Sequence, residues 1–68
     1  MINPFIQRIF QSRQARNGGL VRRNIGWVNF LASMEQLEAE VRRRGFHMFV
    51  VGDQVLILCN SGGLQVVC

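Results

Sequence analysis

Apolar and polar positions in the first part of the chain follow the period of a helix. Asn3 suits the N-cap, and Pro4 suits the first helical position, where the N–H that proline lacks would have no partner. The apolar residues that share one helical stripe are Phe5, Ile6, Ile9 and Phe10. Asn17–Gly19 supplies residues that tolerate a positive φ. The pattern predicts an N-terminal helix that ends at this turn.

The next stretch, residues 20–31, has no clear period. Ile25, Trp27 and Val28 are strand formers, and Gly26 between them suits a bulge or a close approach of backbone. The first four residues could begin a short strand or belong to a linker. We interpret the stretch as mainly extended.

A capped helix is predicted over about Met34–Arg44. Ser33 suits the N-cap, and Gln36 follows three residues later, as in a capping box. The apolar stripe consists of Met34, Leu37 and Val41. Glutamates crowd the first part of the segment and arginines fill its last turn, which is the order that the helix dipole favours. Gly45 suits the position just past a helix end, where φ is positive.

Three apolar runs after Gly45 predict an antiparallel β-meander over residues 46–68. The runs cover residues 46–51, 54–59 and 64–68. Gly52-Asp53 suits a two-residue type II′ turn, because glycine comes first. The register that follows pairs Val51 with Gln54, Phe49 with Leu56 and His47 with Leu58.

The period of two in a strand sorts the side chains of this meander onto two faces. The first face, wholly apolar, holds Phe46, Met48, Val50, Val55, Ile57, Cys59, Leu64, Val66 and Cys68. The second face holds His47, Phe49, Val51, Gln54, Leu56, Leu58, Gln65 and Val67. We expect the 34–44 helix to cover the first face. The second face is too apolar for a solvated antiparallel sheet, so we expect the N-terminal helix or another subunit to cover it.

Length and composition indicate one small α+β domain over residues 1–68. The chain is 49% hydrophobic, which excludes a disordered segment. Residues 1–26 form its basic N-terminal segment, and residues 33–68 hold the helix and the meander that make most of the core. A domain of this size buries little surface, so we expect a homo-oligomer, with a dimer favoured.

The composition also indicates the cellular compartment in which the protein is expected. The apolar runs are far shorter than the about 20 residues of a membrane-spanning helix, so we expect no integral membrane association. No signal peptide is recognised. Cys59 and Cys68 are too few for a disulfide framework, and we expect both as free thiols in the cytoplasm.

The residues that could carry catalysis each have a structural explanation. His47 lies in a predicted strand beside apolar residues, and Cys59 and Cys68 lie on the wholly apolar first face, where a free cysteine behaves as a small hydrophobic residue. These three groups fall short of the four ligands of a zinc site. The sequence contains no phosphate-binding loop, dinucleotide fingerprint or nucleophile elbow. We predict a non-enzymatic protein without catalytic residues, metal or cofactor.

The order of elements from Met34 to Val67 resembles that of the small HicA-type ribonuclease toxins. The elements are a helix, Gly45-Phe46, a strand, Gly52, a strand, Gly62-Gly63 and a strand. The resemblance implies an α/β fold like that of double-stranded-RNA-binding domains, and a ribonuclease-like toxin using His47 is a third functional hypothesis. The family has a histidine after the glycine of the first hairpin, where this chain has Asp53 and Gln54. That departure removes the catalytic group, so the resemblance concerns topology.

Charge is distributed unevenly along the chain, which carries a net charge of +4. Residues 1–26 contain no acid and five arginines: Arg8, Arg13, Arg16, Arg22 and Arg23. Guanidinium groups bind phosphate and carboxylate in a bidentate way, and clustered arginine without acids is typical of a surface that binds a polyanion. A secondary candidate is Arg42, Arg43 and Arg44, in a segment where three glutamates cancel their charge.

The leading hypothesis is a binding protein whose Arg-rich N-terminal segment engages nucleic acid, a nucleic-acid-handling complex or an acidic protein surface. Its size suits a phage or mobile-element product that regulates or inhibits host machinery, as anti-CRISPR proteins do. A basic amphipathic N-terminal helix could instead lie on an anionic membrane. The alternative from another class is an assembly protein that forms a homo-oligomer through the second apolar sheet face.

Overall fold

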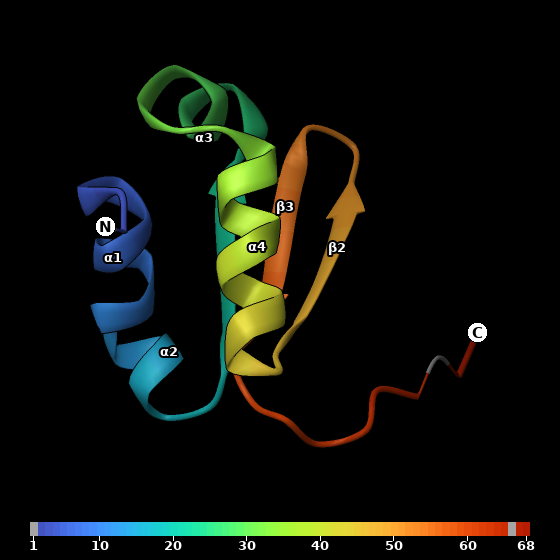
Figure 1. The fold of residues 1–68 in the computed structure, drawn as a ribbon. Coiled ribbons are helices and arrows are strands. Elements are labelled where there is room, and N and C mark those ends of the chain that lie inside the picture. The colour runs from blue at the N-terminus through green and yellow to red at the C-terminus, as the bar shows by residue number, and fades with distance from the viewer. Residues whose placement is uncertain (1, 66) are drawn as a thin grey trace.

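A three-stranded antiparallel sheet with helices packed on one side forms the protein in the computed structural model, which describes residues 2–65, 67 and 68 (Figure 1). The elements in chain order are α1 (Pro4–Gln11), α2 (Arg13–Arg16), β1 (Leu20–Asn24), α3 (Ile25–Leu31), α4 (Met34–Arg44), β2 (His47–Val51) and β3 (Gln54–Leu58). The strand order is β1-β3-β2, and both neighbouring pairs are antiparallel. The α+β class predicted from the sequence is confirmed.

The N-terminal helix predicted from the sequence is confirmed as far as Gln11. Asn3 caps it, since its side-chain oxygen accepts from backbone N–H groups of the first turn. Ser12 then takes an extended conformation and begins α2. Its hydroxyl donates to the Ile9 carbonyl at 2.8 Å and accepts from the Ala15 N–H at 3.4 Å. One predicted helix is therefore two helices, because a serine with these two bonds breaks the helical ladder.

The extended interpretation of residues 20–31 is wrong beyond Asn24. The short strand is confirmed as β1, but the residues that follow it form helix α3. The Asn24 side chain accepts from the Trp27 N–H at 3.3 Å and so caps this helix. This local cap outweighs the strand propensity of the β-branched and aromatic residues of α3.

Helix α4 follows the prediction at both ends. The Ser33 hydroxyl accepts from the Gln36 N–H at 3.0 Å. Gly45 follows the last turn with a φ of 72°, the left-handed region that favours glycine. Leu37 and Val41, from the predicted stripe, are buried. Cap, stripe and end all lie where the sequence placed them.

The β2–β3 hairpin has the predicted turn and the predicted register. Gly52 has a φ of 61°, whereas Asp53 has no positive φ, as a type II′ turn requires. The observed pairs include Val51 with Gln54, Phe49 with Leu56 and His47 with Leu58.

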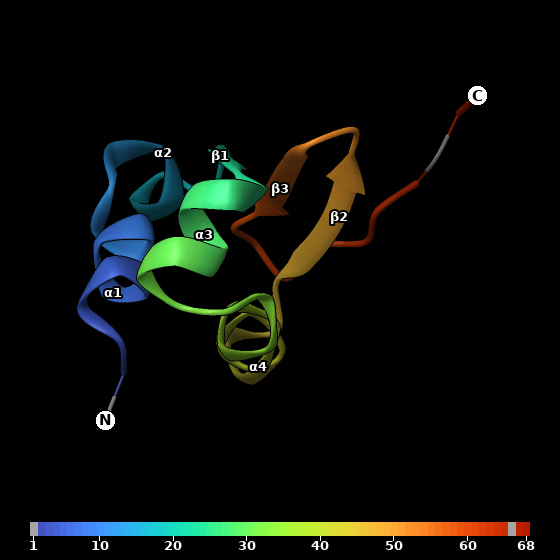
Figure 2. The ribbon, with the colours of Figure 1, turned by 90° about the horizontal axis from the view of Figure 1, so that it is seen from above.

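The third strand predicted at Leu64–Cys68 is wrong. Strand β1 occupies the free edge of β3, with Leu20 opposite Leu58 and Asn24 opposite Gln54. The described residues after Asn60 form no strand, and Val66 lies outside the described residues. This segment runs past β2 and away from the helices (Figure 1, Figure 2). A strand from the N-terminal part thus takes the place that the meander assigned to the C-terminus.

One hydrophobic core is shared by the N-terminal and C-terminal parts of the chain. Its buried residues are Ile6, Ile9, Phe10, Ala15, Val21, Val28, Leu37, Val41, Val55, Ile57 and Cys59. Val55, Ile57 and Cys59 belong to the sheet face that was expected to meet the helices. Residues 1–26 contribute a strand and several core side chains, so the basic N-terminal segment is part of the packed fold.

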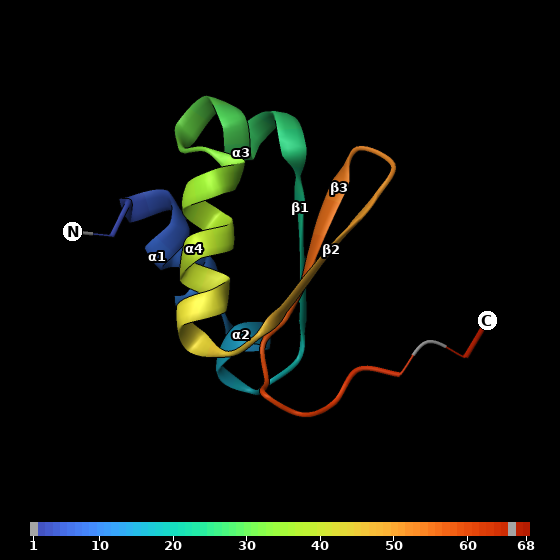
Figure 3. The ribbon, with the colours of Figure 1, turned by 45° about the vertical axis from the view of Figure 1, so that its right-hand side comes forward.

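The second face of the sheet is not covered by the helices (Figure 3). Helix α1 packs into the same core as α4, so the expectation that it would cover the second face is wrong. Phe49, Leu56 and Leu58 are half-buried on that face, and Val51 is 60% exposed. The apolar stripe of α1 is in the core and is not available to a membrane surface. Across residues 2–65, 67 and 68, no helix combines the length and apolar character needed to cross a bilayer.

Candidate polyanion-binding surface

Helix α2 and strand β1 bring four of the predicted arginines onto neighbouring elements. Arg13 and Arg16 belong to α2, and Arg22 and Arg23 belong to β1. The connection between the two elements is tight. Gly18 has a φ of 73°, and the Gly19 N–H donates to the Gln14 carbonyl at 2.7 Å. The Asn60 side chain fixes the same turn, since its amide donates to the Gly18 carbonyl at 2.8 Å.

Two surface hollows lie along these elements. The first, of about 400 Å³, is lined by Arg13, Arg16 and Asn17. The second, of about 380 Å³, is lined by Gln14, Leu20, Val21, Arg22, Arg23 and Leu56. Gln14 of α2 thus lines the hollow of the β1 arginines. We refer to Arg13, Arg16, Arg22 and Arg23 as the basic edge. Arg8 is exposed on α1 and lines neither hollow.

The basic edge carries its positive charge without acidic partners. Within the described part of the chain, the ion pairs closer than 4.0 Å involve the arginines of α4 and none of these four, nor Arg8. Arg23 donates from Nη1 to the Arg22 carbonyl at 2.7 Å, a backbone contact that leaves its charge uncompensated. The first acid in the sequence is Glu35, which explains why residues 1–26 offer no carboxylate. These guanidinium groups remain able to bind an external anion.

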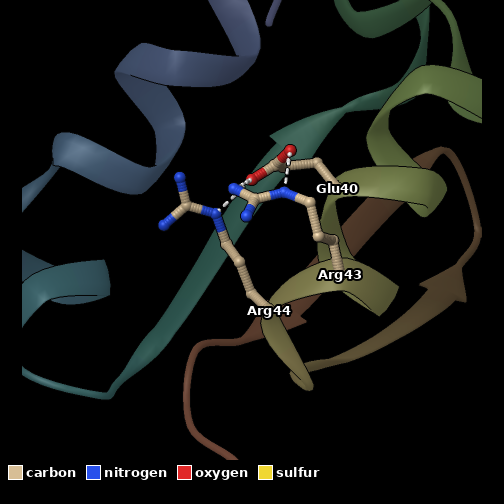
Figure 4. A network of polar contacts seen from close by, with 3 residues as sticks. All are labelled: Glu40, Arg43 and Arg44. Carbon is tan, nitrogen blue, oxygen red and sulfur yellow. Dashed lines mark hydrogen bonds and ion pairs between the residues drawn. The ribbon is translucent and has the colours of Figure 1, made fainter.

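The secondary candidate, Arg42–Arg44, is held by glutamates of its own helix. Arg42 pairs with Glu38 at 2.7 Å. Arg43 and Arg44 both pair with Glu40, each at 2.5 Å, and Figure 4 shows the two guanidinium groups converging on that carboxylate. The hydrogen bond from Arg43, followed by that from Arg44, holds the pKa of Glu40 below its ordinary value although burial acts against it.

Arg44 also joins two helices. Its guanidinium carbon lies 4.4 Å from the centre of the Phe10 ring, within the range of a cation–π interaction. Phe10 is a core residue of α1, so Arg44 links α4 to α1 while Glu40 neutralises its charge. Arg44 therefore has a structural role in the folded chain.

The residues weighed for catalysis form no catalytic arrangement among the described residues. His47 Nε2 lies 2.6 Å from the Gly62 carbonyl, which can only accept, so this nitrogen carries the proton. Burial raises the pKa of the Cys59 thiol, which weakens it as a nucleophile, and Cys59 and Cys68 are both free. No group of three or more potential metal ligands occurs among the described residues. The element order shared with HicA-type toxins loses its last strand, since β1 replaces it.

An exposed aromatic surface on α3 was not predicted from the sequence. Trp27 is 60% exposed, Phe30 78% and Leu31 44%. Val28, on the other side of the helix, is buried and anchors it. The signal that could have found this surface is Asn24, a strong N-cap residue followed by large apolar residues at helical spacing.

Comparison of the chain with protein-family models, with curated proteins and with solved structures found no match.

Proposed function

We propose that this is a small non-enzymatic protein that binds nucleic acid through the phosphates, using the basic edge. The observation that supports the proposal is the contrast between its arginines. Those of the basic edge have no acidic partner, whereas those of α4 are paired with Glu38 or Glu40. A guanidinium fork matches a phosphate oxygen pair, and its charge stays available only where no carboxylate occupies it.

The arrangement of the basic edge suits an extended polyanion. Strand β1 is about 17 Å long at 3.3 Å per residue, and it begins beside α2 (Figure 1). The four arginines thus follow one another along two consecutive elements and do not all belong to one helix or strand. A linear chain of phosphates can contact such a row in succession, whereas a single small anion would use only part of it.

The proposal also includes a cellular role for nucleic-acid binding. A chain of this size with a polyanion-binding margin suits a cytoplasmic regulator or inhibitor of nucleic-acid-handling machinery, of the kind that phages and mobile elements encode. The two free thiols agree with a compartment that keeps cysteines reduced. An acidic protein surface is the competing partner, and the experiment below separates it from nucleic acid.

The test replaces Arg13, Arg16, Arg22 and Arg23 together with glutamine. Labelled oligonucleotides followed by fluorescence anisotropy should bind the native protein with an affinity that falls steeply as salt rises. The variant should bind about a hundredfold more weakly, because its phosphate contacts are gone. Its unfolding free energy should change by no more than about 0.5 kcal/mol per site, since none of the four side chains is part of the core.

Each other outcome is informative. If the variant unfolds, the arginines are structural and the proposal loses its support. If the variant folds and binds like the native protein, another surface binds the nucleic acid. Native protein that shows no salt-dependent binding would point to an acidic protein as the partner.

The uncovered sheet face favours a second candidate function, assembly of a homodimer through that face. Val51 is 60% exposed beside half-buried Phe49 and Leu56, and β2 is an edge strand without charge or proline to protect it. Val51→Lys should abolish dimers seen by sedimentation velocity. Val50→Lys is the matched control, because Val50 is 55% exposed on the opposite face of the same strand. A native protein that stays monomeric up to about 0.5 mM would exclude this assembly role.

A further inference from the structure

Helix α3 presents two aromatic rings to solvent at one end of the sheet. Trp27 and Phe30 are 60% and 78% exposed, and their ring centres lie 6.0 Å apart with the planes 86° to each other. They line a surface hollow of about 340 Å³ together with Asn24 and Gly26. A contiguous exposed apolar patch often marks the binding site of a ligand or a partner.

The local sequence fixes this geometry. Asn24 caps α3, and buried Val28 sets the rotation of the helix, so that Trp27 and Phe30 turn outward. Gly26 has no side chain to fill the hollow. A Cβ at that position would lie 2.9 Å from the Asn24 side-chain oxygen, which itself makes the cap. The Asn24 cap and the buried Val28 side chain therefore fix the position of the two rings. Gly26 leaves the hollow beside them open.

The aromatic pair continues the line of the basic edge. Trp27 follows the end of β1 by three residues, and β1 carries Arg22 and Arg23. Figure 1 shows α2 at one end of β1 and α3 at the other. Asp53 also lies at this end, since its carbonyl accepts from the Ile25 N–H at 2.9 Å. Strand β1 thus contributes two arginines shortly before α3 in the chain, and the neighbouring hairpin turn contributes the carboxylate of Asp53.

We infer that Trp27 and Phe30 form a stacking site for unpaired bases of a single-stranded nucleic acid whose phosphates lie along the basic edge. This inference rests on the proposed function and names its ligand class. Aromatic rings beside a basic groove bind single strands, because every base has a π-face that an exposed ring can cover. In a duplex those faces are already covered by neighbouring bases, so a duplex can engage the arginines but not the rings.

The experiment uses the intrinsic fluorescence of Trp27, the only tryptophan in the chain. A thymidine oligonucleotide of about 15 residues should quench its emission as it binds, because a stacked base deactivates the excited indole. A duplex of the same length and inorganic polyphosphate should bind through the arginines and leave the emission nearly unchanged. Equal quenching by all three polyanions would overturn the stacking site.

Variants separate stacking from charge. Trp27→Ala and Phe30→Ala should each lower the affinity for the single strand about tenfold while leaving the salt slope unchanged, since neither side chain is charged. Leu31→Ala is the matched control, an exposed apolar residue on the same helix without a ring, and should bind within about twofold of the native protein. Thermal melts should show that all three variants are folded, so that a loss of affinity reports on binding.

The two proposals fail in different ways. If the single strand binds with a steep salt dependence, but Trp27 emission does not change and Trp27→Ala binds like the native protein, the stacking site is wrong and the phosphate-binding function stands. If neither single strand nor duplex binds in a salt-dependent way, both are wrong. If Trp27→Ala weakens duplex and single strand equally, α3 contacts the backbone and the base-stacking role is excluded.

Discussion

The arginines of α4 and those of the N-terminal segment are the same residue type in opposite electrostatic situations. In α4, glutamates precede the arginines by three or four residues, and all three guanidinium groups are paired. In residues 1–26 no acid exists to pair with, and the basic edge keeps its charge. The comparison teaches that net charge alone does not locate a polyanion site. What matters is whether a carboxylate lies within reach of each arginine.

The same comparison separates stability from binding. Arg44 contacts both Glu40 and the Phe10 ring, so its removal should disturb the fold. The four arginines of the basic edge are absent from the core and make no ion pair among the described residues, so their removal should disturb binding. A substitution of Arg44 should therefore leave nucleic-acid binding nearly unchanged. Substitutions in the basic edge should leave the stability of the fold nearly unchanged.

The largest expected effect on stability is that of Arg44→Ala. It removes an ion pair with a carboxylate that is only 11% exposed and the contact with Phe10, and we expect a loss of about 1–2 kcal/mol of unfolding free energy. Arg16 is exposed and has no ion pair in the described structure. Arg16→Ala should therefore change the unfolding free energy by less than about 0.5 kcal/mol. Denaturant unfolding monitored by circular dichroism measures both. Equal losses would break the distinction between the two groups.

A smaller effect is expected from acid. The pKa of Glu40 in the folded protein lies below its ordinary value of 4.5, chiefly because of the hydrogen bond from Arg43. The stability that this depression contributes is fully present above pH 4.5 and is lost as the pH falls through the folded-state pKa. Melting temperatures of native protein and Glu40→Gln should therefore differ most at neutral pH and converge in acid. A difference that stays constant down to the acid limit would show that the Glu40 charge contributes nothing.

The smallest effect is expected from Arg8→Gln. Arg8 is exposed on α1 and lines neither hollow of the basic edge, so the affinity for nucleic acid should fall by less than about twofold. Fluorescence anisotropy at fixed salt measures this directly. A loss as large as that caused by Arg16→Gln would extend the binding surface onto α1.

Local signals in the sequence were sufficient for much of the fold. Ser33, Gly45 and Gly52-Asp53 each act within a few residues, and α4 and the β2–β3 register follow from them. The third strand could not be predicted in this way. Two short segments, Leu20–Asn24 and Leu64–Cys68, each contain apolar residues and could pair with the free edge of β3. Which of them pairs there depends on contacts between residues that are distant in the sequence. The β1 pairing joins residues that are thirty or more positions apart.

The candidate site was predictable in its residues but not in its arrangement. The sequence shows which arginines lack a neighbouring acid, and the i, i+4 spacing in α4 shows which have one. It does not show that Arg13 and Arg16 lie on a separate short helix next to β1, because Ser12 and the Gly18 turn set that geometry. The aromatic surface was missed because residues 25–31 were interpreted as extended. In a strand Trp27 would have been one half-buried side chain among others.

The most direct test of the account compares two double variants that change the net charge equally. Arg13→Gln with Arg16→Gln removes charge from the basic edge, and Arg42→Gln with Arg43→Gln removes the same charge from exposed, paired positions of α4. We expect the first variant to flatten the logarithmic salt slope of single-strand binding by about 1.4, at 0.7 per lost phosphate contact, and the second to leave the slope unchanged. If both variants flatten the slope to the same extent, net charge governs binding and the distinction between free and paired arginines is wrong.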